Sequence, residues 1–244
     1  MQETSLDKNL IDHPSLIILL PHMHSYCEKG LTRFSEGKDS FSLTTIETYT
    51  CGVFERVAEL DSALISLRLA CKFVAELGFE QNPSPEVYRY HYENFVLRVI
   101  GLVDRAHRLV GASLLLPSNK YEVVGGNSFV QRAIKTSHPG LNRALDAVAD
   151  AVNSYRGPRN ELIHSSAYSS RELGIFMGVE QFTVDTGTVD ITELKRDYSS
   201  AGAVEIGQTI GRLILTLTVL LEELEPVFST AQKFSILKRD KANT

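Results

Sequence analysis

Apolar residues recur at steps of three and four along most of the chain after residue 54, and this period predicts α-helices. The first helix should span about 25 residues and end before NPSP at 82–85. A second is expected at 91–109, a third from Pro139, and a fourth over about 206–227. The four stripes are Val57, Leu60, Leu64, Leu67, Cys71 and Val74; Phe95, Val99, Leu102, Ala106 and Leu109; Leu141, Leu145, Val148, Val152 and Tyr155; and Ile206, Ile210, Leu213, Leu217, Leu220, Leu224 and Val227.

Three segments depart from this period. Residues 1–50 contain several prolines and glycines, so we expect an irregular N-terminal extension that packs on the same domain, with a short strand or extended arm at 40–50. Residues 116–138 are expected to be a long connection that turns at Gly125-Gly126. The sequence FTVDTGTVDI at 182–191 alternates apolar and polar residues about a Thr-Gly turn, which predicts an inserted β-hairpin.

These elements together predict a mainly α protein. Four long helices fit an up-down helix bundle over 51–244, accompanied by a short additional helix after the third and by the hairpin near 182–191. A chain of 244 residues is long enough to bury such a core as one domain.

The net charge of −5 argues against a general nucleic-acid binder, because binding to the phosphate backbone depends on clustered Lys and Arg. Residues 104–172 are locally basic, with nine Lys/Arg against six Asp/Glu. The start MQETSLDKNL has no secretory signal pattern, and the early apolar run LIILL at 16–20 is too short to span a bilayer. We therefore expect a cytoplasmic protein with no membrane segment.

The cysteines and histidines give little sign of a metal site. The three cysteines form no C-x-x-C pair, which disfavours both a disulfide framework and a cysteine-based zinc site. His22 and His24, with Cys27 nearby, resemble metal ligands but have no fourth partner close in sequence. No cofactor or metal is expected.

The most informative stretch is SYRGPRNELIHSSAY at 154–168. Gly157-Pro158 should end the third helix and start a short new one, which places Arg159 and Asn160 in a first turn where free N–H groups favour an anion. His164 follows Asn160 at i+4 and shares its face. Arg159 lies about 140° around the helix from His164 and would reach the same point only through its long side chain.

These residue types suit a phosphodiester site. Arginine binds phosphate through two fixed N–H groups, and histidine transfers protons near neutral pH, so such a site needs no metal. A solvated helix end is the alternative, since an arginine four to six residues before a histidine also occurs at Arg132 and His138, which Pro139 prevents from sharing one helix.

The sequence RNELIH at 159–164 resembles the motif of the HEPN superfamily (higher eukaryotes and prokaryotes nucleotide-binding), and 91–109 resembles the second helix of bacterial members. The motif covers six residues, and the helical pattern extends the resemblance over about 54–230. The resemblance implies a dimeric, metal-independent endoribonuclease of toxin–antitoxin or phage-defence systems. It implies that His164 acts as general base or acid on the ribose 2′-OH or the leaving oxygen, to give a 2′,3′-cyclic phosphate. Arg159 would stabilise charge on the phosphate and Asn160 would orient the histidine or the phosphate.

Further residues could bind substrate or support the motif. Arg156 directly precedes it, and Glu93, Arg98 and Arg105 lie on the second predicted helix. That helix carries a polar face that could bind along an RNA strand. Because acidic residues lie beside this face, the alternative is that it is simply exposed to solvent. The face consists of His91, Asn94, Arg98, Arg105 and Arg108.

Three functional hypotheses remain open at this point. The first is the endoribonuclease, acting on RNA as a homodimer, with an antitoxin or a nucleotidyltransferase as a possible partner. The second is a non-catalytic HEPN module that binds RNA, a nucleotide or a partner protein. The third is a helical scaffold in which Arg159 and His164 point apart into solvent.

Overall fold

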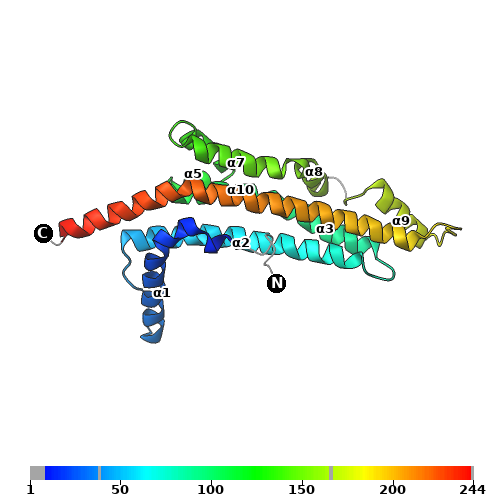
Figure 1. Ribbon diagram of the computed structural model, residues 1–244, viewed down its shortest axis with the longest axis horizontal. Coiled ribbons are helices and arrows are strands. Elements are labelled where there is room, and N and C mark those ends of the chain that lie inside the picture. The colour runs from blue at the N-terminus through cyan, green and yellow to red at the C-terminus, as the bar shows by residue number, and fades with distance from the viewer. Residues whose placement is uncertain (1–8, 38–39, 165–166, 243–244) are drawn as a thin grey trace. The chain divides into compact units, whose positions relative to one another are not determined.

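The computed structural model in Figure 1 describes residues 9–37, 40–164 and 167–242. Every element of secondary structure in these residues is helical, so the protein is mainly α, as the apolar period predicts. The chain forms two compact units. Unit 1 comprises Met1–Asp61, Val103–Val148 and Ile214–Thr244, and unit 2 comprises Ser62–Leu102 and Ala149–Leu213.

The described start of unit 1 is helical, so the expectation of an irregular extension is wrong there. Residues 10–35 form η1 (Leu10–Asp12), η2 (Pro14–Leu19) and α1 (Leu20–Ser35). Both prolines of this segment stand in the first turn of a helix, where the missing N–H costs nothing, and so they start helices instead of breaking them. The backbone N–H groups of Leu10 and Ile11 donate to the buried carboxylate of Asp61 at 2.7 and 2.9 Å, which fixes this segment on α2.

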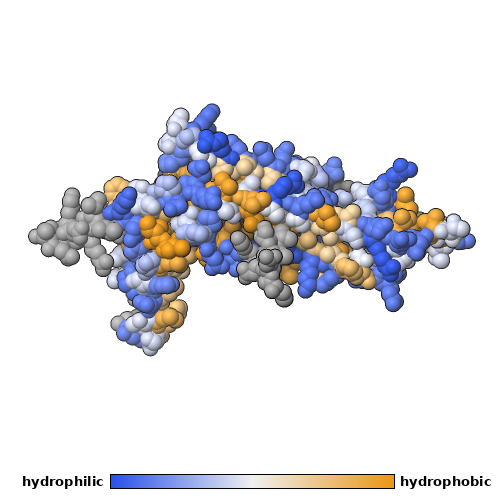
Figure 2. Space-filling view, viewed as in Figure 1, coloured by the Kyte–Doolittle hydropathy of each residue, from blue (hydrophilic) through white to orange (hydrophobic). Residues whose placement is uncertain are grey.

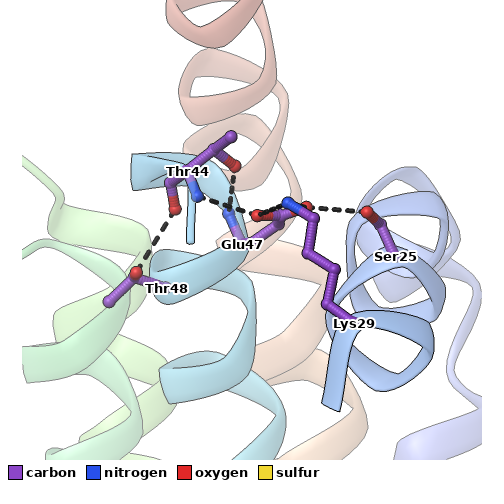
Figure 3. Close-up of polar contacts among 5 residues, drawn as sticks. All are labelled: Ser25, Lys29, Thr44, Glu47 and Thr48. Carbon is purple, nitrogen blue, oxygen red and sulfur yellow. Dashed lines mark hydrogen bonds and ion pairs between the residues drawn. The ribbon is translucent and has the colours of Figure 1, made fainter. Parts of the chain in front are cut away.

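No strand or arm forms at 40–50, because α2 (Thr45–Leu77) begins inside this segment. A reciprocal capping box starts the helix: Thr44 N–H donates to the Glu47 carboxylate at 2.7 Å, and Glu47 N–H donates to Thr44 Oγ1 at 3.3 Å. Lys29 and Ser25 of α1 donate to the same carboxylate at 2.7 Å (Figure 3). Burial raises the pKa of Glu47, but the hydrogen bonds from Lys29, Thr44 and Ser25 outweigh it and lower the pKa to about 2.

The rest of unit 1 contains most of α4 (Gly101–Ser113), α5 (Ser118–Tyr121), α6 (Gly126–Ile134), most of α7 (Pro139–Ala151) and the part of α10 (Ile191–Ala242) from Ile214 onward. The connection expected at 116–138 thus contains two short helices. The turn at Gly125-Gly126 is confirmed, since Gly125 has a φ of 84°, and the third predicted helix does begin at Pro139.

Unit 2 contains α3 (Pro85–Val99), η3 (Asn153–Tyr155), α8 (Arg156–His164) and α9 (Arg171–Gln181), together with the first part of α10 (Ile191–Ala242). The second predicted helix is therefore two helices, α3 and α4, with Ile100 between them.

The hairpin expected at 182–191 does not form, and these residues contain turns and no strand. Aspartate side chains satisfy the backbone locally and so compete with strand pairing. The Asp185 carboxylate accepts from Gly187 N–H at 2.9 Å. The Asp190 carboxylate caps α10 by accepting from Thr192 and Glu193 N–H at 3.0 Å.

The four apolar stripes are confirmed as core positions, apart from Cys71 and Val227, which are half-buried. Phe95, Val99, Leu102, Ala106 and Leu109 are fully buried.

The long helix α10 contains a segment long and apolar enough to cross a membrane, Ile191–Phe234, judged by length and composition alone. Core helices pass the same test, and 44% of its most apolar 18-residue window is buried. This is weak evidence for a membrane segment.

Candidate functional site

The Arg-Asn-x-x-x-His motif lies on α8, but the break before it is not where the sequence places it. The helix α7 ends at Ala151, where Val152 leaves helical geometry with φ −120° and ψ 6°. Gly157-Pro158 instead lies in the first turn of α8, in which a proline loses no hydrogen bond. The expected separation of two helices at Gly157-Pro158 is therefore wrong, whereas the short motif helix is confirmed. Because α8 begins at Arg156, Arg159 and Asn160 are its fourth and fifth residues, so the expectation that both lie in a first turn with free N–H groups is also wrong for Asn160.

The chain is fixed immediately before α8 by Tyr155. Its side chain is buried, and its ring meets the ring of Phe95 edge to face, with centroids 5.1 Å apart at 87°. The hydroxyl donates to the carboxylate of Glu205 at 2.8 Å and shares a hydrogen bond of 3.1 Å with Thr209. Tyr155 thus ties the start of α8 to α3 and α10 within unit 2.

A second anchor follows the motif. Tyr168 N–H donates to Glu93 Oε1 at 2.7 Å, and the Tyr168 ring packs on Tyr92 with centroids 4.5 Å apart. Tyr92 in turn donates to Glu205 at 3.1 Å, so the two anchors meet at one carboxylate. Burial raises the pKa of Tyr92 and Tyr155, which keeps both phenols protonated as donors.

The helix α8 also contacts α3 directly. Glu93, a candidate for substrate binding, therefore holds the backbone beyond the motif in place.

Most of the side chains in and next to the motif are exposed. Arg159 is half-buried, whereas Asn160, His164 and Arg156 are exposed. Within the described residues, none of the four side chains forms a hydrogen bond or ion pair. Asn160 and His164 share a face of α8, and Arg159 lies about 140° around the helix from His164.

The other predicted residues lie on two helices. Arg98 is exposed on α3 and donates through Nε to Asn94 at 2.5 Å. His91 of the same helix stacks on Phe73 with centroids 4.6 Å apart, and burial lowers the pKa of its imidazole. Arg105 belongs to α4 and to unit 1, so it is not part of the site described on α8.

His22 and the tyrosines near residue 90 make structural contacts. His22 is hydrogen-bonded to Gln232 at 2.5 Å, and no group of three His, Cys, Asp or Glu in the described part of the chain could hold a metal. Tyr88 and Tyr92 are buried and stacked on each other, and Tyr90 alone of the three is largely exposed.

Unit 2 also contains a cavity of about 590 Å³ that the sequence did not reveal. It lies between α9, the turns at 182–190 and the start of α10, where Figure 2 shows a cluster of hydrophobic residues. The exposed Val184 and Val189 line it. Their alternation with polar residues in the sequence is the signal for these apolar side chains, and the same alternation is typical of a strand.

The anchors at Tyr155 and Glu205 were also missed. Tyr155 belongs to a predicted apolar stripe, and periodicity gives no information about what its hydroxyl binds.

The short helix α8 therefore presents a guanidinium, an amide and an imidazole to solvent from a backbone anchored at both ends. Such a surface can bind an anion through Arg159 and exchange a proton through His164. Comparison of the chain with family models, with curated proteins and with solved structures finds no match.

Proposed function

We propose that this protein is a metal-independent endoribonuclease of the HEPN type, an up-down helix bundle that acts as a homodimer in the cytoplasm in a toxin or phage-defence role. Cleavage proceeds by attack of the ribose 2′-OH on the adjacent phosphate, which forms the P–O2′ bond and breaks the P–O5′ bond, giving a 2′,3′-cyclic phosphate on one fragment and a 5′-OH on the other. His164 accepts the proton of the 2′-OH or donates a proton to the leaving oxygen, and Arg159 stabilises the charge that develops on the phosphate. Asn160 orients either His164 or the phosphate.

The observation that supports this proposal is a short helix on which Arg159, Asn160 and His164 form no hydrogen bond or ion pair within the described residues, with Asn160 and His164 exposed. A helical scaffold would share this arrangement, so cleavage of RNA is the result that separates the two hypotheses. A guanidinium that served only to stabilise the fold would be expected to have a carboxylate or carbonyl partner, as Arg56 has in Glu59 and Glu122. Arg159 has none among the described residues, so it is available to a phosphate. The chain is anchored before α8 at Tyr155 and after it at Tyr168, and such a fixed backbone favours catalysis by positioning.

A homodimer is favoured by the geometry of α8. Because Arg159 and His164 project about 140° apart on the helix, a second copy of the chain is the natural source of the missing group at each phosphate. Mixing the inactive variants Arg159→Ala and His164→Ala should then restore part of the activity, since one of the two sites in the mixed dimer keeps both groups. A site contained in one chain predicts that the mixture stays inactive.

The experiment that tests the activity is incubation of the purified protein with RNA in EDTA. Wild-type protein should cleave, and His164→Ala should lose at least about a hundredfold in rate, the lower range for removal of a general acid–base. His138→Ala is the matched control, because this histidine lies outside α8 and should leave the rate unchanged. Cleavage that survives in His164→Ala would remove the catalytic assignment.

A second candidate is a HEPN module that binds RNA, a nucleotide, an antitoxin or a nucleotidyltransferase without cleaving RNA. It is favoured by one observation: no hydrogen bond from a described residue orients His164, whereas catalytic histidines are usually held by a third group. This candidate predicts RNA binding that Arg159→Ala weakens and His164→Ala leaves intact, with no cleavage by the wild type.

A further inference from the structure

A pocket of about 510 Å³ opens in unit 1 between the end of α4, the start of α7 and the C-terminal part of α10. Its volume falls in the range of small-molecule sites, which are mostly apolar with a few polar groups. The apolar part of the lining includes Leu114, Leu115, Leu141, Pro226, Val227 and Phe234. This pocket is in a different unit from α8, so the inference drawn from it does not rest on the proposed ribonuclease activity.

The conformation of Leu115 is the first observation that indicates ligand binding in this pocket. It follows α4 with a φ of 52°, in the left-handed region where glycine is the usual residue. The bonds of Leu116 N–H to Gly111 O at 2.9 Å and of Leu115 N–H to Ala112 O at 3.1 Å form the usual glycine-type helix end. The leucine gains little from burial in return, since its side chain is 73% exposed. Backbone strain combined with an exposed apolar side chain points to a ligand contact.

Phe234 faces the same pocket and is 65% exposed. Two large apolar side chains, Leu115 and Phe234, thus stand in the pocket lining with most of their surface in water. The apolar part of a ligand bound between Leu115 and Phe234 would remove that surface from water.

The charge in the lining comes from Glu223. Its carboxylate lies directly over Gly140 in the first turn of α7, so close that a Cβ on this glycine would overlap it. The lining contains no Lys or Arg, and its histidine, His138, has Nδ1 3.0 Å from Ser137 Oγ. The fixed charge on the lining is therefore negative.

A further polar group in the lining lacks a partner. The hydroxyl of Ser113 is buried and makes no hydrogen bond within the described part of the chain, although the Ser113 carbonyl accepts from Tyr49 at 3.0 Å. Buried hydroxyls normally have hydrogen-bond partners, so the Ser113 hydroxyl is an unsatisfied polar group in the pocket lining. Rotation of the serine side chain toward the pocket would offer an acceptor to a ligand donor.

We propose that this pocket binds a small organic cation, a protonated amine carried on an aromatic or alkyl body. The apolar body packs between Leu115 and Phe234, and the ammonium group lies against the Glu223 carboxylate. A carboxylate ligand would meet like charge at Glu223. A neutral apolar ligand would cover that carboxylate without compensating its charge.

The test uses three probes of one shape: 2-phenylethylamine, 2-phenylethanol and 3-phenylpropionate. Each is titrated at pH 7 into isotopically labelled full-length protein, and affinity is followed by heteronuclear NMR. The amine should bind about two- to fivefold more tightly than the alcohol, the ratio that one exposed ion pair supplies. The propionate should bind more weakly than the alcohol.

Two variants decide whether Glu223 causes this preference. Glu223→Gln removes the charge, and Gly140→Ala keeps the charge but displaces the carboxylate with its new Cβ. Both should bring the amine-to-alcohol ratio close to one. Glu225→Gln is the control, because it removes the same charge from α10 at a residue outside the pocket lining, and it should keep the ratio.

Several results would overturn the proposal. These are equal affinity for amine and alcohol, tighter binding of the propionate, no binding of any probe, or an amine preference that persists in both Glu223→Gln and Gly140→Ala.

Discussion

The carboxylate of Glu47 offers the sharpest prediction about stability. It is only 5% exposed, receives hydrogen bonds from Lys29, Ser25 and Thr44, and joins α1 to the first turn of α2. Replacement by glutamine keeps the shape of the side chain but removes the charge, and with it the ion pair to Lys29. The variant Glu47→Gln should therefore lose stability in proportion to how strongly the fold prefers the ionised form.

The pKa sets that magnitude. The fold lowers the pKa of Glu47 from 4.5 to about 2. A shift of this size corresponds to about 3 kcal/mol of unfolding free energy. Because the folded pKa is below the unfolded one, this contribution is complete above about pH 5 and is lost as the pH falls toward 2.

The assay is thermal unfolding of wild type and Glu47→Gln between pH 7 and pH 2. At pH 7 the melting temperature of the variant should be about 6–12 °C lower than that of the wild type. The melting temperatures of the two proteins should converge near pH 2. Hydrogen exchange of the α1 amides would show whether α1 opens before the rest. The control is Glu76→Gln on the same helix, whose exposed pair with Lys72 at 3.8 Å should change stability by less than about 0.5 kcal/mol. A difference between wild type and Glu47→Gln that stays constant across the pH range, or that is absent at pH 7, would refute the reasoning.

Three further substitutions test the packing by urea unfolding. Tyr155→Phe removes the hydroxyl bonded to Glu205 and should cost about 1 kcal/mol; an unchanged midpoint would show that this anchor of α8 is not stabilising. Gly111→Ala places a Cβ 2.8 Å from the buried ring of Tyr121 and should cost about 1–3 kcal/mol, so a neutral effect would contradict the described contact. Leu115→Gly relieves a positive φ and should stabilise by about 1 kcal/mol while weakening binding of 2-phenylethylamine; lower stability would argue against strain at this residue.

The core was predictable because burial follows helical period. Positions such as Leu64, Phe95, Leu145 and Ile210 were assigned to the core from spacing alone, and all are buried. Spacing depends only on the geometry of the helix, so it needs no knowledge of what each face contacts.

Helix ends and turns were less predictable, because they depend on local competition. Gly157-Pro158 looked like a break, yet proline is equally suited to a first helical turn. The alternation at 182–191 looked like a hairpin, yet Asp185 and Asp190 bind the local backbone instead. In both places the same residues permit two structures, and the neighbouring side chains decide between them.

The candidate site was predictable in part. The sequence places Arg159 and His164 on one short helix, and the structure agrees. The sequence could not reveal that Tyr155 and Glu93 hold the two ends of α8, because those contacts join residues 50 and 75 positions apart. Pockets share this difficulty, since their walls come from segments that are distant in sequence.

The most direct test of the central claim is to incubate purified protein in EDTA with an RNA that it cleaves and with the same RNA carrying 2′-deoxyribose at the cleaved position. The 2′-OH is the attacking group in the proposed reaction. We therefore predict a 2′,3′-cyclic phosphate product from the first RNA and no cleavage of the second at that position. Cleavage of the deoxy-substituted strand, or no cleavage of any RNA by the wild-type protein, would contradict the account.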